Sequence, residues 1–409
     1  MNSSNVVAAW WRTRRALHMA PAQLKRQRER RWHNLQPALA RTPALADLAG
    51  QPLEAFPVTE LAELRNDYGL WNSLGLSDGA LRAMANRAET GEPGEEISAG
   101  WSSGSSGEQR GLFVSGPAER AEYLGQSLAR LLPLRAVLRG QRLALHLRAS
   151  NTLYNSVARR HFAFTHFPLD AAPDQTAAAL QHYAPTILIA PPHRLLAMAQ
   201  GGIRLPGLRH LFCGSEPLSE AERAFIADFF HLHPRHIYQA TEGFLGADCA
   251  MGRLHLNDHV LDIRLEQVAG TSGFRPIITD LCRTSQPIVR VRGDDYLELD
   301  SRPCPCGFAG RVIAPIQGRV GDIWQLDGRM VTPPQIVAAL DPVLGAGQQW
   351  QAIASAEGIT LRVASHCPAV LAEPATQALS ALCRKPVRTA LDLPAWTGPK
   401  RRRVVWSHG

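Results

Sequence analysis

The chain has 409 residues, of which 45% are hydrophobic and 20% are charged, and its formal net charge is +8. These values exclude a disordered chain and predict one large domain or two with an ordinary apolar core. No apolar run approaches the roughly 20 residues that cross a membrane, and the start of the chain lacks the apolar stretch of a signal peptide. Seven scattered cysteines indicate a reducing compartment, so we expect a cytoplasmic protein.

The first 90 residues are predicted to be mainly helical, with breaks at Pro21, Pro37 and Pro43. Ser77 is a plausible N-cap for a helix that runs to residue 87. A Gly/Ser-rich loop at 101–111 follows, and Pro117 opens the next helix. Beyond it, strands are predicted at 141–148, 161–167, 185–190, 208–213 and 236–238, and helices at 172–183, 194–200 and 219–230.

This alternation of strands and helices predicts an α/β fold with parallel sheets. Polar turns follow successive strands, which is where ligands bind in such sheets. From about residue 252 the pattern becomes β-rich, and it changes again near Gly318. The remainder predicts a small α+β domain: a helix from Pro333, strands at 350–354 and 359–364, a helix from Glu373 and a strand at 387–391. We therefore expect a large domain over 1–318, with a helical leader over about 1–90, and a small C-terminal lid domain over 319–409.

The positive charge is concentrated in two clusters, at 25–31 and 400–403. Such clusters are also found in proteins that bind nucleic acids. No aromatic residue for base stacking is interleaved in the first cluster, so a solvated helix face is favoured there. No nucleic-acid partner is expected.

The loop at 101–111 is the first candidate site. Glycine leaves the backbone free to approach a ligand closely, and successive backbone N–H groups form a nest for anions, to which serine hydroxyls add donors. A flexible linker explains the same composition equally well. The loop also lacks the Walker pattern, because no Lys-Ser/Thr pair follows its last glycine. The other unusual segments decide between these interpretations.

Five segments of the chain, in this order, resemble the adenylate-forming superfamily of acyl-CoA synthetases and adenylation domains. They lie at 102–107, 214–217, 238–243, 287–295 and 318–322. The resemblance extends from about residue 95 to residue 403. The branch that looks most similar contains the phenylacetate-CoA ligases and the related synthetases that adenylylate a deazaflavin coenzyme.

The resemblance implies a set of nucleotide-binding residues. The phosphate loop would consist of Ser102, Ser103, Gly104, Ser105, Ser106 and Gly107, with Arg110 where lysine is usual. The adenine would lie between the loop of Ser215, Glu216 and Pro217 and the segment of Tyr238 and Gln239, with the tyrosine ring against it. Asp295 would bind the ribose hydroxyls, and Asp294 is the alternative.

The resemblance also implies catalytic roles. Thr241 would contact the α-phosphate and Glu242 would hold Mg²⁺, while Arg319 lies near the nucleotide and Asp322 is the hinge. Lys400 would be the catalytic lysine, although a solvated basic tail is the alternative for such a run. These cations would stabilise the negative charge that develops when a carboxylate attacks ATP and expels pyrophosphate.

The implied function is the ATP-dependent activation of a small carboxylic acid, aromatic or otherwise apolar, as its acyl-adenylate. The acyl group would then pass to a thiol of CoA or of an acyl carrier protein. Two alternatives remain: an adenylyltransferase that acts on a phosphate-bearing coenzyme, and a catalytically degenerate homologue that serves as a scaffold.

A second candidate site contains Cys249, His255, Cys304 and Cys306. The Cys-x-Cys pair is followed by a turn glycine and is compact enough to chelate, and three cysteines with one histidine are a legitimate tetrahedral zinc set. Two thiols at a turn beside unrelated buried residues are the alternative. Similar Cys-Gly turns recur at this place in the phenylacetate-ligase branch, so the resemblance adds to the case for structural zinc.

Overall fold

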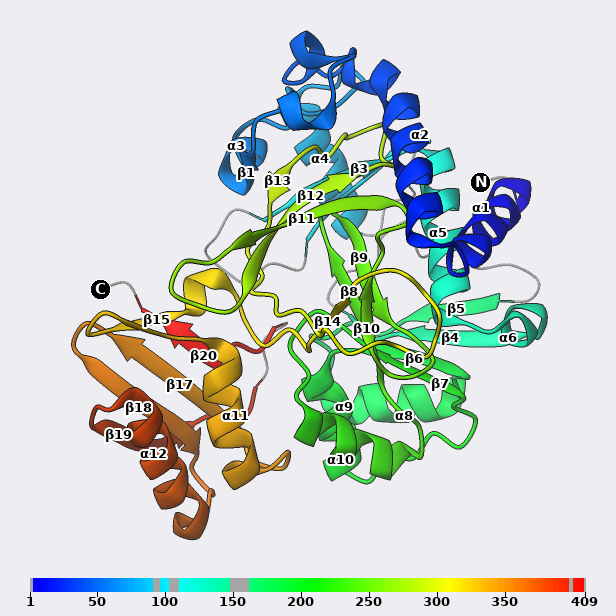
Figure 1. The fold of residues 1–409 in the computed structure, drawn as a ribbon. Coiled ribbons are helices and arrows are strands. Elements are labelled where there is room, and N and C mark those ends of the chain that lie inside the picture. Colours follow the sequence, from blue (N-terminus) through cyan, green and yellow to red (C-terminus); the bar gives the residue numbers. More distant parts are fainter. Residues whose placement is uncertain (1–2, 91–95, 103–109, 148–161, 397–399, 408–409) are drawn as a thin grey trace.

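The computed structural model describes residues 3–90, 96–102, 110–147, 162–396 and 400–407. Figure 1 shows a large body of sheets and helices, with the segment after about residue 320, in orange and red, packed at its lower left. Among the described residues, no helix has the length and apolarity that a membrane span requires.

An eight-stranded sheet in the order β14-β10-β9-β8-β7-β6-β4-β5 forms the centre of the body. The neighbours from β5 to β8 are parallel, whereas β9, β10 and β14 continue the sheet in antiparallel pairs. The strands are β4 (Gln141–Leu145), β5 (Phe162–His166), β6 (Ile187–Ala190), β7 (His210–Cys213), β8 (Arg235–Ala240), β9 (Gly243–Asp248), β10 (Leu254–Leu256) and β14 (Val312–Ile313). The predicted α/β class with parallel strands and a β-rich part is confirmed.

Both faces of the parallel strands are apolar, because helices cover both. Leu188 and Leu211 face one core, which includes residues of three helices. Ile187 and Phe212, their neighbours along the strands, face the opposite core. The helices are α8 (Pro173–Tyr183), α9 (Pro192–Gln200) and α10 (Glu220–Phe230) on the first face, and α5 (Pro117–Leu131) and α6 (Leu134–Leu138) on the second.

A second sheet, in the order β1-β13-β12-β11, packs with the N-terminal helices around the largest core of the molecule. Its strands are β1 (Thr59–Glu60), β11 (Leu261–Gln267), β12 (Phe274–Asp280) and β13 (Val291–Arg292), and the hairpin β2 (Ser98–Trp101) and β3 (Leu112–Ser115) lies beside it. The N-terminal elements are α1 (Ser3–Ala16), α2 (Pro21–Leu39), η1 (Ala46–Leu48), η2 (Leu53–Ala55), α3 (Leu61–Asn66) and α4 (Asp78–Glu89).

Two predictions about these helices have opposite outcomes. Ser77 caps α4 as predicted, because its side chain accepts a hydrogen bond from the N–H of Ala80. The predicted break at Pro37 is wrong, since Pro37 lies inside α2. The helix ends two residues later, so the missing N–H removes one bond from a turn that is about to end.

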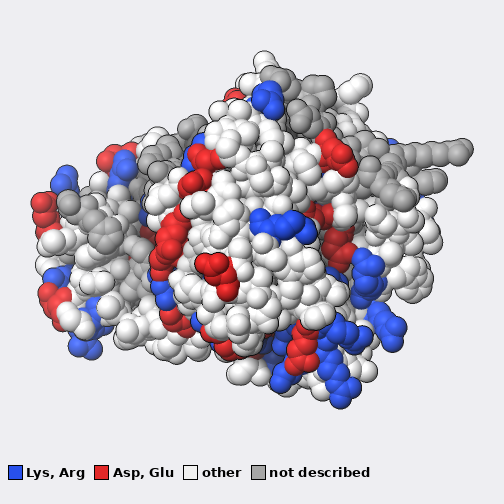
Figure 2. All heavy atoms as spheres, turned by 90° about the horizontal axis from the view of Figure 1, so that it is seen from above, with Lys and Arg blue, Asp and Glu red and all other residues white. Residues whose placement is uncertain are grey.

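The first basic cluster is not simply a solvated face, because two of its arginines pack onto the body. Arg28 donates to the carbonyl of Asp258 at 2.8 Å, and Arg31 forms a 3.2 Å ion pair with Glu122. Figure 2 shows acidic side chains beside the basic ones on the face seen there. The two signs of charge are therefore interspersed on that face.

The C-terminal residues form a core of their own around Trp324, Leu340 and Leu361. A four-stranded sheet in the order β19-β18-β17-β20 is covered by two helices, and a two-stranded hairpin precedes them. The elements are η3 (Val320–Asp322), β15 (Trp324–Leu326), β16 (Arg329–Val331), α11 (Pro333–Leu344), β17 (Trp350–Ser355), β18 (Gly358–Ala364), α12 (Ala369–Cys383), β19 (Val387–Leu393) and β20 (Val404–Trp406). The second helix begins before the predicted Glu373, and the sequence analysis missed β20.

Candidate active site

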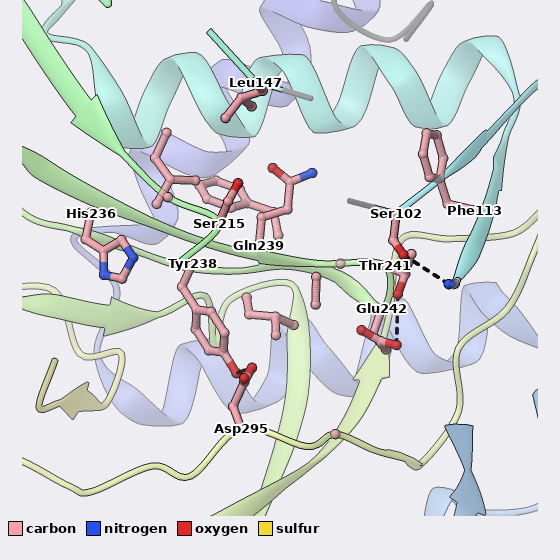
Figure 3. A pocket seen from close by; sticks show the side chains of 18 of the residues that line it. Ser102, Phe113, Leu147, Ser215, His236, Tyr238, Gln239, Thr241, Glu242 and Asp295 are labelled. Atoms are coloured by element: carbon pink, nitrogen blue, oxygen red, sulfur yellow. Dashed lines mark hydrogen bonds between the residues drawn. The ribbon is translucent and has the colours of Figure 1, made fainter. Parts of the chain in front are cut away.

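A cavity of about 490 Å³ opens where the carboxyl ends of β7 and β8 approach the β2–β3 hairpin and the C-terminal part of the chain. The sequence-predicted residues among those that line it are Ser102, Ser215, Glu216, Pro217, Tyr238, Gln239, Thr241, Glu242, Asp295, Arg319 and Lys400. Ser103, Gly104, Ser105, Ser106 and Gly107 lie outside the described residues. Figure 3 shows Ser102, Thr241 and Glu242 at one side of this cavity and Tyr238 with Asp295 below it.

The Gly/Ser loop connects the antiparallel strands β2 and β3, so it does not follow a parallel strand as the sheet rule suggests. Ser102 Oγ accepts a 3.0 Å hydrogen bond from the N–H of Gly111 at the base of the loop. A Cβ on Gly111 would lie 2.7 Å from Thr241 Oγ1, so only glycine allows this close approach. Arg110 forms an ion pair with Glu89 at 2.6 Å, which ties this cation to α4.

The segment after β7 contains a tight and unusual turn. A Cβ on Gly214 would lie 3.0 Å from the carbonyl oxygen of Ile237 on the neighbouring strand. Ser215 has a φ of 73°, which is uncommon for a residue other than glycine and is typical of functional sites. The strand end is therefore held close to β8, where the next predicted residues lie.

Glu216 is buried, and both of its carboxylate oxygens are engaged. One accepts from the N–H of His193 at 2.7 Å and from its ring at 2.9 Å, and the other accepts from the backbone N–H of Arg401 at 2.8 Å. Burial alone would raise the pKa of Glu216, but Arg401 and His193 together lower it. The side chain that was predicted to bracket adenine thus anchors the C-terminal segment.

Tyr238 of β8 meets Asp295, which lies in the segment after β13. The tyrosine hydroxyl donates a 2.8 Å hydrogen bond to Asp295, and Tyr238 is buried whereas Asp295 is half-buried. Burial, followed by the charge of Asp295, raises the pKa of Tyr238 well above its ordinary value, so the hydroxyl remains a donor. Asp294 instead forms a 2.8 Å ion pair with Arg275 on a more exposed edge.

Thr241 and Glu242 occupy the turn between β8 and β9. Thr241 Oγ1 donates to Glu242 at 3.0 Å, and Arg283 holds the turn by donating to the carbonyl of Thr241. Burial raises the pKa of Glu242, since a charged carboxylate is costly out of water. Carboxylate oxygens are the ligands that Mg²⁺ prefers, and a cation would offset this cost, so the residue fits the predicted metal role.

Gln239, within β8, is hydrogen-bonded to a residue of α5. Its side-chain oxygen accepts a 2.6 Å hydrogen bond from the hydroxyl of Tyr123. The predicted strand ends at residue 238, whereas β8 continues through Ala240, so Gln239 belongs to the strand rather than to a loop. The sequence analysis missed Tyr123, because an aromatic residue on an amphipathic helix is typical of a core.

Lys400 enters the cavity from the C-terminal part of the chain. Arg319, Asp295, Glu216 and Glu242 all lie close enough to influence its charge. Burial, followed by repulsion from Arg319, lowers the pKa of Lys400. The interpretation of this residue as part of a solvated tail is therefore wrong.

The three residues after Lys400 are also bound, and we call them the arginine clamp (Arg401, Arg402 and Arg403). Arg401 forms a 2.6 Å ion pair with Glu222 on α10, and Arg402 pairs with Asp322. Arg403 reaches Asp341 at 3.0 Å and Glu222 at 3.5 Å. The sequence analysis did not predict this role for Glu222. Its position in the first turn after Ser219 already accounts for a glutamate there, so the sequence carries no sign of an ion pair.

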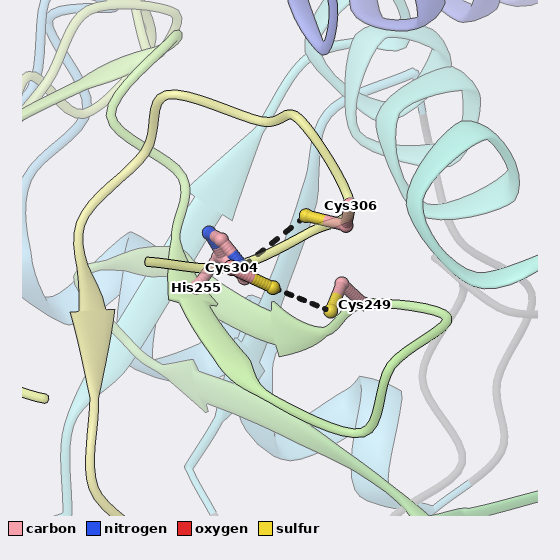
Figure 4. A group of neighbouring side chains, drawn as sticks. All are labelled: Cys249, His255, Cys304 and Cys306. Carbon is pink, nitrogen blue, oxygen red and sulfur yellow. Dashed lines mark hydrogen bonds between the residues drawn. The ribbon is translucent and has the colours of Figure 1, made fainter. Parts of the chain in front are cut away.

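The Cys/His set also comes together, beside the turn where β9 ends and β10 begins (Figure 4). The four ligand atoms of Cys249, His255, Cys304 and Cys306 lie within 4.8 Å of one another. Two sulfur atoms are 3.7 Å apart, and another lies 3.4 Å from Nε2 of the histidine. Zn–S bonds of about 2.3 Å place tetrahedral sulfur atoms about 3.8 Å apart, so the set matches zinc.

The histidine has the tautomer that a metal site requires. Nδ1 of His255 lies 2.8 Å from the carbonyl of Gly310, so this nitrogen carries the proton. Nε2 then presents its lone pair toward Cys306. Because ligating histidines usually donate their other N–H in this way, the contact with the carbonyl of Gly310 also fits zinc.

The fold is that of the adenylate-forming acid–CoA ligases. Solved structures of this kind match most of the chain, with low sequence identity. 2-Hydroxyisobutyryl-CoA ligase in its postadenylation state with R3-HIB-AMP gives a TM-score of 0.71 at 15% identity, over 96% of this chain and 91% of that chain. The amide bond synthetase McbA from Marinactinospora thermotolerans gives 0.55 at 11% identity, over 97% and 98%. ATP-bound MatB from Rhodopseudomonas palustris gives 0.53 at 14%, over 74% and 66%.

No family model matches the sequence, and no curated protein matches it. The comparisons thus confirm the predicted fold, whereas the phenylacetate-CoA ligase branch stays a prediction. The open and thioesterification forms of the 2-hydroxyisobutyryl-CoA ligase give TM-scores of only 0.51 and 0.50. As a whole, this chain is thus more similar to the postadenylation form than to the other two forms.

Proposed function

We propose that the protein is an ATP-dependent ligase that activates a carboxylic acid as its acyl-adenylate. One observation carries this proposal: Lys400 and Arg319 converge on the same cavity as Glu242 and Asp295, although the four residues come from distant parts of the chain. Two cations beside a carboxylate suited to Mg²⁺ form a site for a triphosphate, whose reaction needs positive charge already in place.

In the proposed reaction, a carboxylate oxygen of the acid attacks the α-phosphorus of ATP. The P–O bond to the β-phosphate breaks, and pyrophosphate leaves with the electron pair. Lys400 and Arg319 offset the charge on the phosphate oxygens, and Thr241 donates to the α-phosphate. Mg²⁺ bound at Glu242 would supply further positive charge.

Nucleotide recognition is assigned to the remaining residues of the cavity. Asp295, held by Tyr238, would accept hydrogen bonds from the ribose hydroxyls. The tyrosine ring and the turn of Ser215, Glu216 and Pro217 would flank the adenine. Ser102 and the loop of 103–107 would hold the phosphates through backbone N–H groups.

We further propose that residues 319–409 act as a lid that turns about Asp322 after adenylation. The separate core of this part and the likeness to one conformational state of a ligase support this. Turning the lid would remove Lys400 and admit a thiol of CoA or of an acyl carrier protein. The acid is expected to be aromatic or otherwise apolar, since much of the cavity lining is apolar.

Exchange of labelled pyrophosphate into ATP, with a panel of acids, tests the adenylation step. We expect acid-dependent exchange in the natural protein and a loss of at least about a hundredfold in Lys400→Ala. Lys385→Ala is the matched control, because that lysine forms a partly exposed ion pair with Asp327 elsewhere in the same part of the chain. ATP binding without exchange for every acid would favour the scaffold alternative.

Mass spectrometry of the products separates the remaining alternatives. A thioester formed with CoA or with a carrier protein supports the ligase and identifies its acceptor. A stable AMP adduct of a phosphate-bearing coenzyme, with no thioester, would support the adenylyltransferase instead.

We also propose structural zinc at the Cys/His set. When bound there, zinc would tie the loop that carries Cys304 and Cys306 to the ends of β9 and β10. Elemental analysis of the purified protein should give close to one zinc per chain. Cys306→Ser should lower this value, and Cys367→Ser, which changes a buried thiol in the C-terminal core, should leave it unchanged.

A further inference from the structure

The cavity continues beyond its polar residues, along the face of the parallel strands that α5 covers. Leu143, Ile187, Ile189, Phe212 and Phe162 line this extension, and they come from four neighbouring strands. Leu143 pairs with Ile187, and Ile189 pairs with Phe212, so these residues share one face of the sheet. The extension is therefore a continuous apolar surface rather than a set of unrelated contacts.

The opposite wall of the extension is α5. Leu124, Leu128 and Leu131 line the cavity at helical spacing, so they lie on one face of the helix. Another face of α5 packs against α1, where a Cβ on Gly125 would lie 2.5 Å from Ala9. Packing against α1 thus holds the helix in place while its leucines face the cavity. Figure 3 shows Leu147 on the side of the cavity away from Ser102.

The strand register gives the length of the extension. The polar part of the cavity begins at Gly214, directly after β7, whereas Ile187 pairs with His210 at the start of β7. Four residues separate these two levels, and a strand rises by about 3.3 Å per residue, so the apolar surface is about 13 Å long. It extends from the carboxyl ends of the strands to their amino ends.

The two ends of the cavity differ in polarity. Glu242, Asp295 and Lys400 lie at the carboxyl ends of the strands, whereas leucine, isoleucine and phenylalanine predominate in the extension, where Ser127 of α5 is a polar exception. His236, which also lines the cavity, stays neutral because burial lowers its pKa to about 4. A charged group on the ligand would therefore be costly at the amino ends.

We propose that the acid is an elongated aliphatic acid, with its carboxylate beside Thr241 and its chain beneath α5. This inference rests on the proposed adenylation. A single aromatic ring beside Gln239 would leave the leucine-lined end unfilled and forgo its dispersion contacts. A long chain fills the full length, and every methylene that it adds leaves water.

A series of unbranched acids from butyric to dodecanoic acid, with benzoic and phenylacetic acid for comparison, tests this inference in the pyrophosphate exchange assay. Each added methylene should raise kcat/KM by about fourfold, which corresponds to about 0.8 kcal/mol, until the channel is full. Preference for the aromatic acids, or no dependence on chain length, would overturn the inference while leaving adenylation intact. If none of the acids supports pyrophosphate exchange, the result would contradict the proposed function itself.

Two variants test where the aliphatic chain of the acid lies. Ile187→Phe should lower the ratio of kcat/KM for octanoic acid to that for butyric acid by at least about tenfold, because the larger side chain blocks the deep end. Ala163→Phe is the matched control, since Ala163 is exposed on the edge strand β5 of the same sheet, and its ratio should not change. If Ile187→Phe does not fold, Phe212→Ala should instead move the preference toward longer acids. A ratio that neither variant changes would refute the placement.

Discussion

Replacing Glu222 by glutamine is the sharpest test of how the proposed lid (residues 319–409) is held. Glu222 is buried on α10 and faces both Arg401 and Arg403 of the arginine clamp. Glutamine keeps the shape and can still accept the 3.0 Å hydrogen bond from the N–H of Ser219 that caps the helix. The substitution therefore removes the charge and little else.

The magnitude follows from the electrostatics of the pair. Burial would raise the pKa of Glu222, but Arg401 and Arg403 outweigh it and lower the pKa from 4.5 to about 2. At 1.36 kcal/mol per pKa unit, the shift corresponds to about 3 kcal/mol in the folded protein, in the range for breaking a buried ion pair, and turning the proposed lid would lose the share that Arg401 and Arg403 supply. Because the pKa is lowered on folding, this contribution is present above pH 4.5 and is lost as the pH falls toward 2.

Small-angle scattering and pyrophosphate exchange measure the consequence. At neutral pH, Glu222→Gln should shift the closed–open ratio toward open by about a hundredfold, so the radius of gyration increases and exchange slows. Glu54→Gln is the control, since it removes a carboxylate from an exposed ion pair with Arg264. An unchanged scattering profile and an unchanged exchange rate would refute the assignment of the clamp as the element that holds the lid.

Three further predictions concern single groups. Burial lowers the pKa of Lys400, so the exchange rate should decline at a pH below that of an ordinary lysine, and Lys400→Arg should abolish this decline while lowering the maximal rate. Tyr238→Phe removes the donor to Asp295, and the KM for ATP should rise about tenfold in steady-state assays, with folding unchanged by circular dichroism. Removing zinc with a chelator should lower the melting temperature by several degrees, and an unchanged temperature would contradict a structural metal at Cys306.

Much of the fold was predictable because its signals are local. Alternating residues marked β4 and β5, short apolar runs marked other strands such as β6, and caps such as Ser77 and Ser219 marked helix starts. The errors also have physical causes. Pro37 was tolerated because it lies in a final turn, and β20 was missed because three residues after a basic run carry little pattern.

The candidate site was predictable to the extent that its residues form ordered segments along the chain. Its charges were less predictable, since ion pairs join residues that are distant in sequence. Glu216 was expected to face the nucleotide, yet its carboxylate binds His193 and the backbone of Arg401, residues that no local pattern connects to it. Similarly, Arg110 seemed to be a free cation of the phosphate loop, but it pairs with Glu89.

The arginine clamp also explains why a basic run follows the proposed catalytic lysine. A lysine beside Arg319 in a buried cavity is repelled, so its position must be enforced by its neighbours in the chain. Arg401 and Arg403 bind carboxylates on α10 and α11, which lie on the two sides of the lid boundary. Lys400 therefore cannot leave the cavity unless the pairs to Glu222 break. If the lid turns, the energy of that step is set largely by the clamp, and only secondarily by the hinge.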